Sequence, residues 1–262
     1  MTKARSPLPF QTILITGTTS GLGLALLERF HDRGAEVICI NRRRSELLES
    51  RFPRARFEMI DITDSTEVNA LVGQLVSTVK RPILCILNAA VNPVDNEERF
   101  NAAEFSMVLR INLLGVTNFV GAFESLVEVK SVILTIGSTA VWYFNRAHLG
   151  YYLSKLVLHH LHRSLWRTGT RHSLKLVFAG PMMTGIAAQG HLSGIRRTVF
   201  VWLAAPVDAV AEKVERFANG SRRVLVVSLR AAAFYFLVGM LDRLAGIPMS
   251  LWSMAGLPSR RR

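Results

Sequence analysis

Cysteine, long apolar runs and a leader-like N-terminus are all scarce or missing in this 262-residue sequence. The two cysteines, Cys39 and Cys85, both lie inside apolar runs, so we expect buried, inert thiols in a reducing compartment. Met1 to Phe10 are mostly polar and lack the apolar core of a signal peptide. We expect no membrane span, because no stretch reaches the roughly 18 apolar residues that one needs. These absences favour a cytoplasmic protein.

Acidic residues are also few. There are 19 Asp and Glu against 32 Lys and Arg, for a formal net charge of +13. The arginine clusters are spread along the chain, at 42–44, 196–197, 222–223 and 260–262. They do not form a recognisable nucleic-acid-binding motif, so we expect no nucleic-acid partner. A solvated basic surface, a cofactor phosphate or an anionic membrane surface are the alternatives that remain.

The composition, 50% hydrophobic, suits one large α/β domain with a well-buried core. β-branched and apolar runs predict strands at 12–15, 36–40, 57–60, 83–87, 131–136, 174–178 and 224–227. Helices are expected at 24–30, 64–79, 102–129, 150–168 and 209–218, and residues 182–194 are loop-like or weakly helical. Strands that alternate with helices predict a doubly wound parallel sheet of about seven strands, with helices on both faces.

The stretch from Thr16 to Gly23, Thr-Gly-Thr-Thr-Ser-Gly-Leu-Gly, lies between the first predicted strand and the first predicted helix. Glycines let the backbone turn tightly and approach a phosphate, and a helix N-terminus presents free N–H groups and a positive dipole end. The spacing Gly-x-x-x-Gly-x-Gly differs from the commoner Gly-x-Gly-x-x-Gly. Alone, this pattern is also compatible with a structural turn.

The end of the second predicted strand bears on cofactor choice. An acidic residue there would bind a ribose 2′-hydroxyl and repel a 2′-phosphate. This sequence has Asn41 and then Arg42, so we expect the phosphorylated cofactor, NADP(H), with Arg42 facing the 2′-phosphate. Arg43 and Arg44 fit ordinary surface charges.

Six short motifs occur in order, each at a strand end or on a helix face: Thr16-Gly17-x-x-x-Gly21-x-Gly23, Asp61, Asn88-Ala89-Ala90, Asn112, Ser138 and Tyr151-x-x-x-Lys155. Together they resemble the short-chain dehydrogenase/reductase family over roughly residues 10 to 228. The resemblance implies a Rossmann-like fold, nicotinamide chemistry and a homodimer or homotetramer built through the helices that carry Asn112 and Tyr151. It also implies the cofactor-binding set Gly17, Thr19, Ser20, Gly21, Leu22, Gly23, Asn41, Arg42, Asp61, Ile62, Asn88, Ala89, Tyr151, Lys155, Gly180 and Thr184.

The residue chemistry supports the catalytic part of this resemblance. Tyr151 and Lys155 are four residues apart and project from one face of a helix. An ammonium near a phenol favours the phenolate, so we expect the pKa of Tyr151 to be lowered from about 10. Tyr151 is then the general acid or base, and Ser138 holds the substrate oxygen. The resemblance further implies that Lys155 binds the nicotinamide ribose and that Asn112 supports a water-linked proton path.

Some positions depart from the family pattern. Leu87-Asn88-Ala89-Ala90 replaces the usual Asn-Asn-Ala-Gly, and Ala179-Gly180-Pro181 replaces a Pro-Gly pair. His159, His160 and His162 have no acidic neighbours in the sequence, so we expect no metal site. Met182, Met183, Ile186 and Leu192 fit an apolar lid over the substrate.

We expect residues 1–228 to form the dinucleotide-binding and catalytic domain, and residues 229–262 to be an apolar and basic extension. Such a tail can lie in a membrane interface, pack on a second subunit or cover the substrate pocket. The sequence as a whole predicts an NADP(H)-dependent oxidoreductase for the carbonyl or alcohol group of an apolar, lipid-like substrate. The alternative is a catalytically idle dinucleotide-binding sensor or scaffold.

Overall fold

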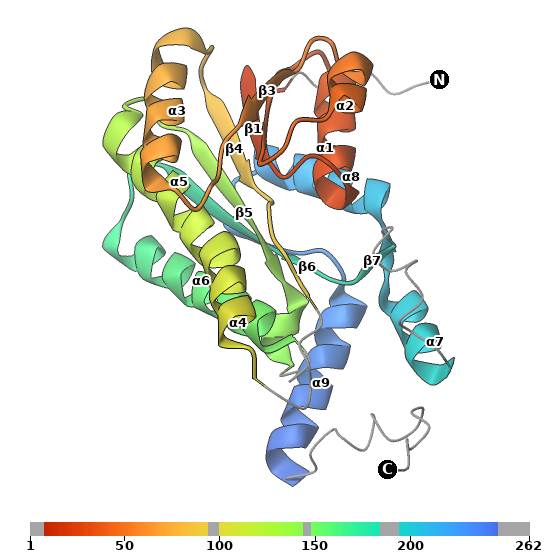
Figure 1. Ribbon diagram of the computed structural model, residues 1–262. Helices are drawn as coiled ribbons and strands as arrows, with labels where there is room; N and C mark the ends of the chain where they lie inside the picture. The colour runs from red at the N-terminus through yellow and green to blue at the C-terminus, as the bar shows by residue number, and fades with distance from the viewer. Residues whose placement is uncertain (1–7, 94–99, 144–147, 184–193, 246–262) are drawn as a thin grey trace.

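The structure is a computed structural model that describes residues 8–93, 100–143, 148–183 and 194–245. Seven parallel strands form one sheet in the order β3-β2-β1-β4-β5-β6-β9 (Figure 1). The strands are β1 Thr12–Thr16, β2 Glu36–Asn41, β3 Arg56–Met59, β4 Ile83–Leu87, β5 Val132–Ser138, β6 Ser173–Ala179 and β9 Val224–Val226. The predicted doubly wound sheet is therefore confirmed, and each strand lies within two residues of its expected bounds.

Helices cover both faces of this sheet (Figure 1). They are α1 Gly21–Asp32, α2 Glu46–Arg51, α3 Ser65–Thr78, α4 Ala102–Leu109, α5 Gly115–Leu126, α6 Leu149–Thr168, α7 Gly194–Leu203, α8 Val207–Asn219 and α9 Leu229–Ala245. A 3₁₀ turn, η2 (Thr139–Trp142), follows β5, and a small pair of strands joins β7 (Met182–Met183) to β8 (Ala205–Pro206). The sequence did not predict α2, α7, α9 or this small pair as elements, and described residues 231–241 only as an apolar run.

Successive side chains of each strand enter two different cores, because a strand presents alternate residues to opposite faces. Ile13 and Ile15 of β1 pack with Phe30 of α1 and Val214 of α8. Leu14, between them, packs in the other core, which α3, α5 and α6 close. Burial on both faces explains why the strands are continuous apolar runs rather than alternating ones.

The helix expected at 102–129 is one rod with a change of winding. α4 passes into a π-helical segment, η1 (Arg110–Leu114), and then into α5, which ends at Leu126 where the backbone becomes extended. By length and composition this rod, 25 residues of hydropathy 1.3, could cross a membrane, so the estimate that no segment is long enough was wrong. Here the rod packs in the core through Phe119 and Phe123, as an apolar helix of a globular domain does.

A buried carboxylate joins α8 to α1. Glu215 is 2% exposed, and its two oxygens accept hydrogen bonds from Arg29 and Arg33. The two guanidinium groups give both carboxylate oxygens the hydrogen-bond donors that burial would otherwise deny them. The contact fixes α8 against α1 on one face of the sheet.

Both cysteines are buried and free, as expected from their apolar surroundings. Burial disfavours the thiolate and raises the pKa of Cys39 to about 11, and burial also raises the pKa of Cys85. Neither thiol is therefore a nucleophile at neutral pH.

Candidate active site

The predicted site residues meet at the carboxyl edge of the sheet. Thr16, Asn88 and Ser138 end or follow β1, β4 and β5, and all the strands of the sheet run parallel. The strand order reverses between β1 and β4, since β2 and β3 lie to one side and β5 to the other. Ligands of doubly wound sheets bind in the crevice at such a point.

The glycine stretch is held in a conformation that requires glycine. Gly17 has a φ of 72°, and a Cβ there would lie 2.9 Å from the Cα of Ala89. A Cβ on Gly23 would lie 1.9 Å from the carbonyl oxygen of Gly17. The close packing of this loop on the start of α1 and on the end of β4 therefore depends on these two residues.

Hydrogen bonds tie the ends of β1 and β4 together behind this loop. The Asn88 amide donates to the carbonyls of Thr16 and Gly17, at 3.1 and 2.9 Å. The Thr16 hydroxyl accepts from the backbone N–H groups of Asn88 and Ala89, each at 3.0 Å. Asn88, predicted as a cofactor contact, thus also fixes the shape of the glycine loop.

The first turn of α1 fits an anionic group. The side chain of Ser20, at the N-cap, does not cap the helix, and the first turn has no acidic residue. Thr19 and Ser20 are exposed, so the unpaired N–H groups of the first turn open toward the carboxyl edge of the sheet. These donors suit the phosphates of a dinucleotide.

The adenosine end of the predicted site contains one difference from expectation. The Asn41 side chain is buried, and its oxygen accepts from the Thr18 N–H at 2.8 Å while its amide donates to the Thr18 hydroxyl at 2.9 Å. Asn41 therefore holds the glycine loop against the end of β2, and its contact with a cofactor stays a prediction.

Arg42 is exposed beside Asp61 at this end. The Thr63 N–H, which donates to Asp61 at 2.9 Å, is the main cause of the lowered pKa of Asp61, and the Arg42 charge contributes to it. Arg44 by contrast donates to Glu49 and is a surface ion pair. Ile62 packs against the face of Gly115 in α5. Arg42 thus keeps a solvent-facing charge where a ribose phosphate is predicted to lie.

Ser138 and Tyr151 are brought together between the end of β5 and the first turn of α6. Their side chains are hydrogen-bonded, and the Ser138 oxygen also accepts from the Ala140 N–H at 3.1 Å. The Lys155 ammonium lies over the Tyr151 ring, 5.6 Å from its centroid, and donates to the Ile136 carbonyl at 2.8 Å. A hydroxyl, a phenol and a cation therefore form one cluster at the carboxyl edge of the sheet.

The expected direction of the Tyr151 shift was wrong. Burial raises the pKa of the phenol, and the hydrogen bond with Ser138 offsets this only in part. The Lys155 ammonium lies over the ring face and is bound to a backbone carbonyl instead of lying at the phenol oxygen. Burial also lowers the pKa of Lys155 to about 8, because it disfavours the ammonium.

Asn112 is fully buried in the π-helical segment. Its oxygen accepts from the Val91 N–H at 2.8 Å, and its amide donates to the Val91 carbonyl at 2.9 Å and to the Ser154 hydroxyl at 3.2 Å. The side chain thus fastens the segment after β4 to α6, next to the catalytic cluster. Its predicted part in a proton path stays a prediction.

The region after β6 is described only in part. Gly180 faces Ala231 of α9, where a Cβ on the glycine would lie 3.2 Å from the alanine methyl group. Thr184, Ile186 and Leu192 lie outside the described residues, and Met182 and Met183 form β7. The contact of Thr184 with the carboxamide and the apolar lid therefore stay predictions.

Two tyrosines that the sequence patterns did not indicate lie beside this cluster. Tyr143, which follows η2, stacks on Tyr235 of α9, with ring centroids 6.0 Å apart and planes 13° apart. Burial, and then the nearness of Tyr143 and Tyr151, raises the pKa of Tyr235 to about 12. No spacing rule connects Tyr143 with Tyr235, because a fold contact across most of a domain brings them together.

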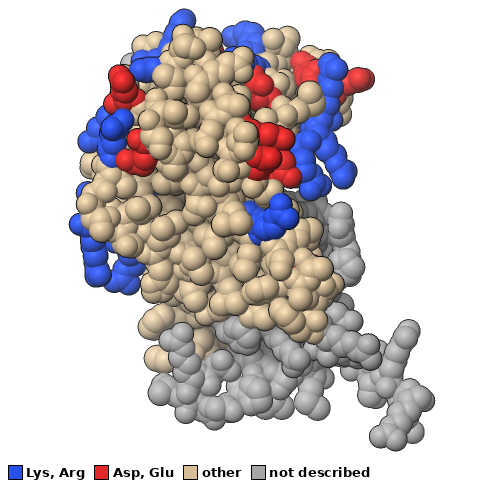
Figure 2. Space-filling view, turned by 60° about the vertical axis from the view of Figure 1, so that its left-hand side comes forward, with Lys and Arg blue, Asp and Glu red and all other residues tan. Residues whose placement is uncertain are grey.

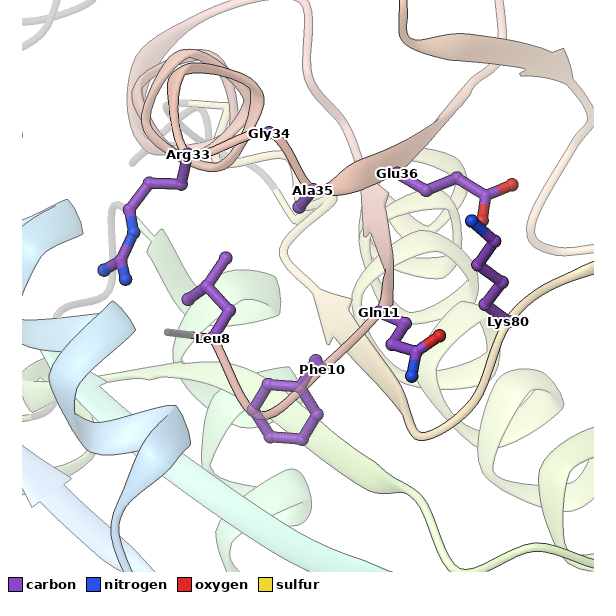
Figure 3. A pocket seen from close by; sticks show the side chains of 8 residues that line it. All are labelled: Leu8, Phe10, Gln11, Arg33, Gly34, Ala35, Glu36 and Lys80. Carbon is purple, nitrogen blue, oxygen red and sulfur yellow. The ribbon is translucent and has the colours of Figure 1, made fainter. Parts of the chain in front are cut away.

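A cavity of about 490 Å³ lies elsewhere, at the amino ends of β1 and β2 (Figure 3). Glu36 and Lys80 point toward one another across it, and Arg33 at its border is engaged with Glu215. The lining residues are Leu8, Phe10, Gln11, Arg33, Gly34, Ala35, Glu36 and Lys80. None of them belongs to the predicted site, so we assign the chemistry to the carboxyl edge instead.

The profile of the short chain dehydrogenase family matches residues 11–193. This chain belongs to the short-chain dehydrogenase/reductase family. It is an oxidoreductase of the kind that binds a nicotinamide dinucleotide. The glycine loop, Asn88, Asn112, Ser138, Tyr151 and Lys155 all lie inside the matched range.

Among curated relatives, galactitol 2-dehydrogenase of Rhizobium johnstonii is 24% identical over 201 residues, which cover 73% of this chain and 78% of the relative. 3alpha-hydroxysteroid dehydrogenase of Mediterraneibacter gnavus is 24% identical over 164 residues, which cover 59% of this chain and 66% of the relative. Such relatives act on the alcohol or carbonyl groups of small molecules.

Solved structures share the fold. A short-chain dehydrogenase/reductase of Burkholderia phymatum, in complex with NAD, superposes with a TM-score of 0.73 at 18% identity and covers 92% of this chain and 97% of its own. An alcohol dehydrogenase of Thermococcus sibiricus, complexed with 5-hydroxy-NADP, superposes with a TM-score of 0.70 at 17% identity. The match covers 83% of this chain and 96% of the other. Since the two hold different dinucleotides, cofactor preference has to be argued from this chain's own residues.

Proposed function

We propose that this protein transfers a hydride between NADP(H) and the carbonyl or alcohol group of an apolar substrate. The observation that carries the proposal is the cluster of Ser138, Tyr151 and Lys155 at the carboxyl edge, beside a glycine loop whose helix N-terminus accepts an anion. A sensor or scaffold has no need of a hydroxyl, a phenol and a cation in this arrangement.

The residues can perform carbonyl reduction as follows. A nicotinamide dinucleotide, when bound along the glycine loop, would supply the hydride for the carbonyl carbon. Tyr151 donates its phenol proton to the carbonyl oxygen, so that the alcohol O–H forms as the phenol O–H breaks. Ser138 donates a hydrogen bond to the same oxygen and holds it against the phenol. Lys155, as the ammonium, stabilises the phenolate that remains until solvent returns the proton.

Because burial raises the pKa of Tyr151, the phenol is protonated at neutral pH, which is the form that donates a proton in carbonyl reduction. The pKa of Lys155, about 8, leaves most of that residue charged at pH 7. Acid and cation are then both in the form that reduction uses. In the reverse direction a phenolate base would be needed first, and burial disfavours it.

The phosphorylated cofactor is favoured by the residues at the end of β2. No carboxylate occupies that strand end, and Arg42 presents an exposed guanidinium beside it. A guanidinium can bind a 2′-phosphate through two parallel hydrogen bonds. Asp61 lies near Arg42 but follows β3, and its oxygen is engaged by Thr63.

Two features support an apolar substrate. The stacked rings of Tyr143 and Tyr235 lie beside Tyr151, and α9, which carries Tyr235, is rich in aliphatic and aromatic residues. A relative of this chain bears the name of a hydroxysteroid dehydrogenase. Aromatic rings offer a large apolar contact area, which suits a flat or long apolar molecule.

The proposal is tested by following NADPH and NADH consumption with a panel of steroid, long-chain acyl and small polar ketones. We expect turnover with NADPH and an apolar ketone. Arg42→Ala should raise the Kd for NADPH at least tenfold, a loss of about 1.4 kcal/mol, and leave the Kd for NADH unchanged.

Arg44→Ala is the matched control, because Arg44 already pairs with Glu49. It should leave both Kd values unchanged. Equal losses for both cofactors in Arg42→Ala would make Arg42 a structural residue. Tighter NADH binding by the unaltered protein would contradict the cofactor assignment.

A further inference from the structure

The inner face of α9 packs on the elements that carry the catalytic cluster. A Cβ on Gly239 would lie 2.2 Å from the Trp142 carbonyl oxygen, so the helix backbone touches the end of η2. Ala231, on the inner face of the same helix, lies against Gly180, and Tyr235 stacks on Tyr143. α9 is therefore one wall of the region around Ser138 and Tyr151 (Figure 1).

The outer face of α9 is just as apolar as the inner one. Leu229, Phe236 and Leu237 are 76%, 61% and 51% exposed, and Met240 is exposed on the same side. At 100° per residue, positions 229, 233, 236, 237 and 240 form one stripe along the helix. A helix at the surface of a globular protein normally has a polar outer face, so α9 is built to contact something apolar.

A second helix extends this surface. Val201 and Trp202 of α7 are exposed, and the Arg230 guanidinium of α9 lies 5.9 Å from the centre of the Trp202 ring. We call this set the α7–α9 surface; its apolar members are Val201, Trp202, Leu229, Phe236, Leu237 and Met240. An exposed tryptophan beside an arginine is typical of a protein surface at the boundary between lipid and water.

Among residues 198–203 of α7 and 229–240 of α9, whose side chains the structure describes, Arg230 is the one charged residue. No acidic residue occurs in α7 or in residues 229–240 of α9, and Asp242 comes further along α9, after this stretch. Figure 2 shows that, on the face it presents, charged side chains gather toward the upper end, away from the end at which α9 lies. The described part of the α7–α9 surface is thus apolar, with the Arg230 guanidinium beside Trp202.

These features decide between two occupants. In a two-fold contact between copies, residues 194–203 and 229–240 of the second copy would offer Arg230 no carboxylate, because neither range contains an acidic residue. A bilayer with anionic headgroups complements both properties, because the apolar side chains enter the acyl boundary and the Arg230 guanidinium meets a phosphate.

We propose that the α7–α9 surface binds the face of a lipid bilayer that carries anionic headgroups. Tyr235 then lines the substrate region from one side of α9 while Phe236 and Leu237 contact lipid from another. The binding itself does not depend on catalysis. Entry of a membrane-dissolved substrate past α9 rests on the proposed function.

The test uses the full chain and vesicles of phosphatidylcholine, with or without phosphatidylserine, separated by flotation. We expect binding to the anionic vesicles and weaker binding at high salt. The double variant Phe236→Glu/Leu237→Glu should lose at least tenfold in binding. Arg230→Gln should lose about fivefold, equivalent to about 1 kcal/mol for one basic residue, and only on anionic vesicles.

Leu47→Glu is the matched control, since Leu47 is 75% exposed on α2, which lies away from α9 (Figure 1). It should bind vesicles like the unaltered chain, and circular dichroism should show that all variants are folded. Unchanged binding by the double variant, or an equal loss in Leu47→Glu, overturns the proposal. A chain that ignores vesicles but changes from dimer to monomer in the double variant also overturns it, in favour of a second copy.

This outcome is separate from the proposed function, because vesicle binding needs neither cofactor nor turnover. If vesicles bind but no ketone is reduced, the surface stands and the proposed chemistry fails. If ketones are reduced but vesicles do not bind, the proposed chemistry stands and the membrane-binding surface is overturned. If both hold, the double variant should lose turnover of a vesicle-embedded ketone and keep that of a water-soluble one.

Discussion

Tyr151 and Lys155 illustrate what a spacing can and cannot predict. Four residues on a helix bring a phenol and an ammonium to one face, and the structure has them there, with the nitrogen 5.6 Å from the ring centroid. The pKa of the phenol depends instead on how deeply the rest of the chain buries it. That depth comes from packing around α6, which no local spacing contains, so the predicted direction was wrong.

Two asparagines have contacts that the sequence did not predict. Asn41 and Asn112 were expected to serve the cofactor and the proton path. The structure shows their amides bound to Thr18 and to Val91, in contacts between segments far apart in the sequence. A side-chain amide fits many partners, and tertiary structure alone selects one.

Lys155 leads to a prediction about pH and stability. Its pKa is about 8 in the folded protein and 10.5 in the unfolded chain, so the unfolded chain binds more protons between these values. The burial of this amine therefore destabilises the fold fully below about pH 8, and the effect disappears as the pH rises to 10.5. The gain is about 3 kcal/mol over that window.

Urea unfolding from pH 7.5 to 10.5 tests this pH dependence when the unaltered protein is compared with Lys155→Met. Other titrating groups contribute equally to both proteins, so they cancel in the difference between the two free energies of unfolding. We expect the free energy of unfolding of the unaltered protein to rise relative to the variant. A difference that stays constant or falls would show that Lys155 keeps an ordinary pKa in the folded state.

At the scale of elements, strands were the most predictable. Their apolar runs are long because both faces are buried, and every one was found near its expected bounds. α2, six residues with one buried side chain, has too little periodicity to be recognised. The π-helical turn at Arg110–Leu114 could not be predicted either, since its buried Asn112 is held by Val91 from another segment.

The packing of α1 on α8 depends on Glu215. Glu215→Gln removes the charge that two guanidinium groups share, and we expect the free energy of unfolding to fall by about 3 kcal/mol, the lower end for a broken buried ion pair because both arginines are partly exposed. Glu212→Gln is the control: its carboxylate is partly exposed, and it should change stability by less than about 1 kcal/mol. Equal effects in urea unfolding would contradict this role for Glu215.

At the scale of the whole molecule, the sequence allowed three interpretations of the tail: a membrane contact, a subunit contact or a cover over the pocket. Its first part, α9, packs beside the catalytic cluster, in line with the reading that it covers the pocket, and the apolar outer face leaves room for a membrane contact as well. One helix can cover the pocket and contact a membrane at the same time, because it presents a different face to each. The composition of the run could not separate them, since both sides are apolar.

A homodimer is expected to form through another surface. Met107, Leu114 and Val157, on the outward sides of the α4–α5 rod and of α6, are 42%, 46% and 43% exposed. Leu114→Glu/Val157→Glu should reduce the mass in light scattering from twice the 29.2 kDa of one chain to that of a single chain. A monomeric unaltered protein, or a double variant that remains dimeric, would contradict this interface.

The claim that Tyr151 transfers the proton is tested most directly by the turnover of Tyr151→Phe with NADPH and the best ketone of the panel. The change removes one hydroxyl and keeps the aromatic ring in contact with the Lys155 ammonium. We expect kcat to fall by at least about 100-fold, as for a lost general acid, while the Kd for NADPH changes less than about threefold. A variant that keeps most of its activity would show that Tyr151 is not the acid.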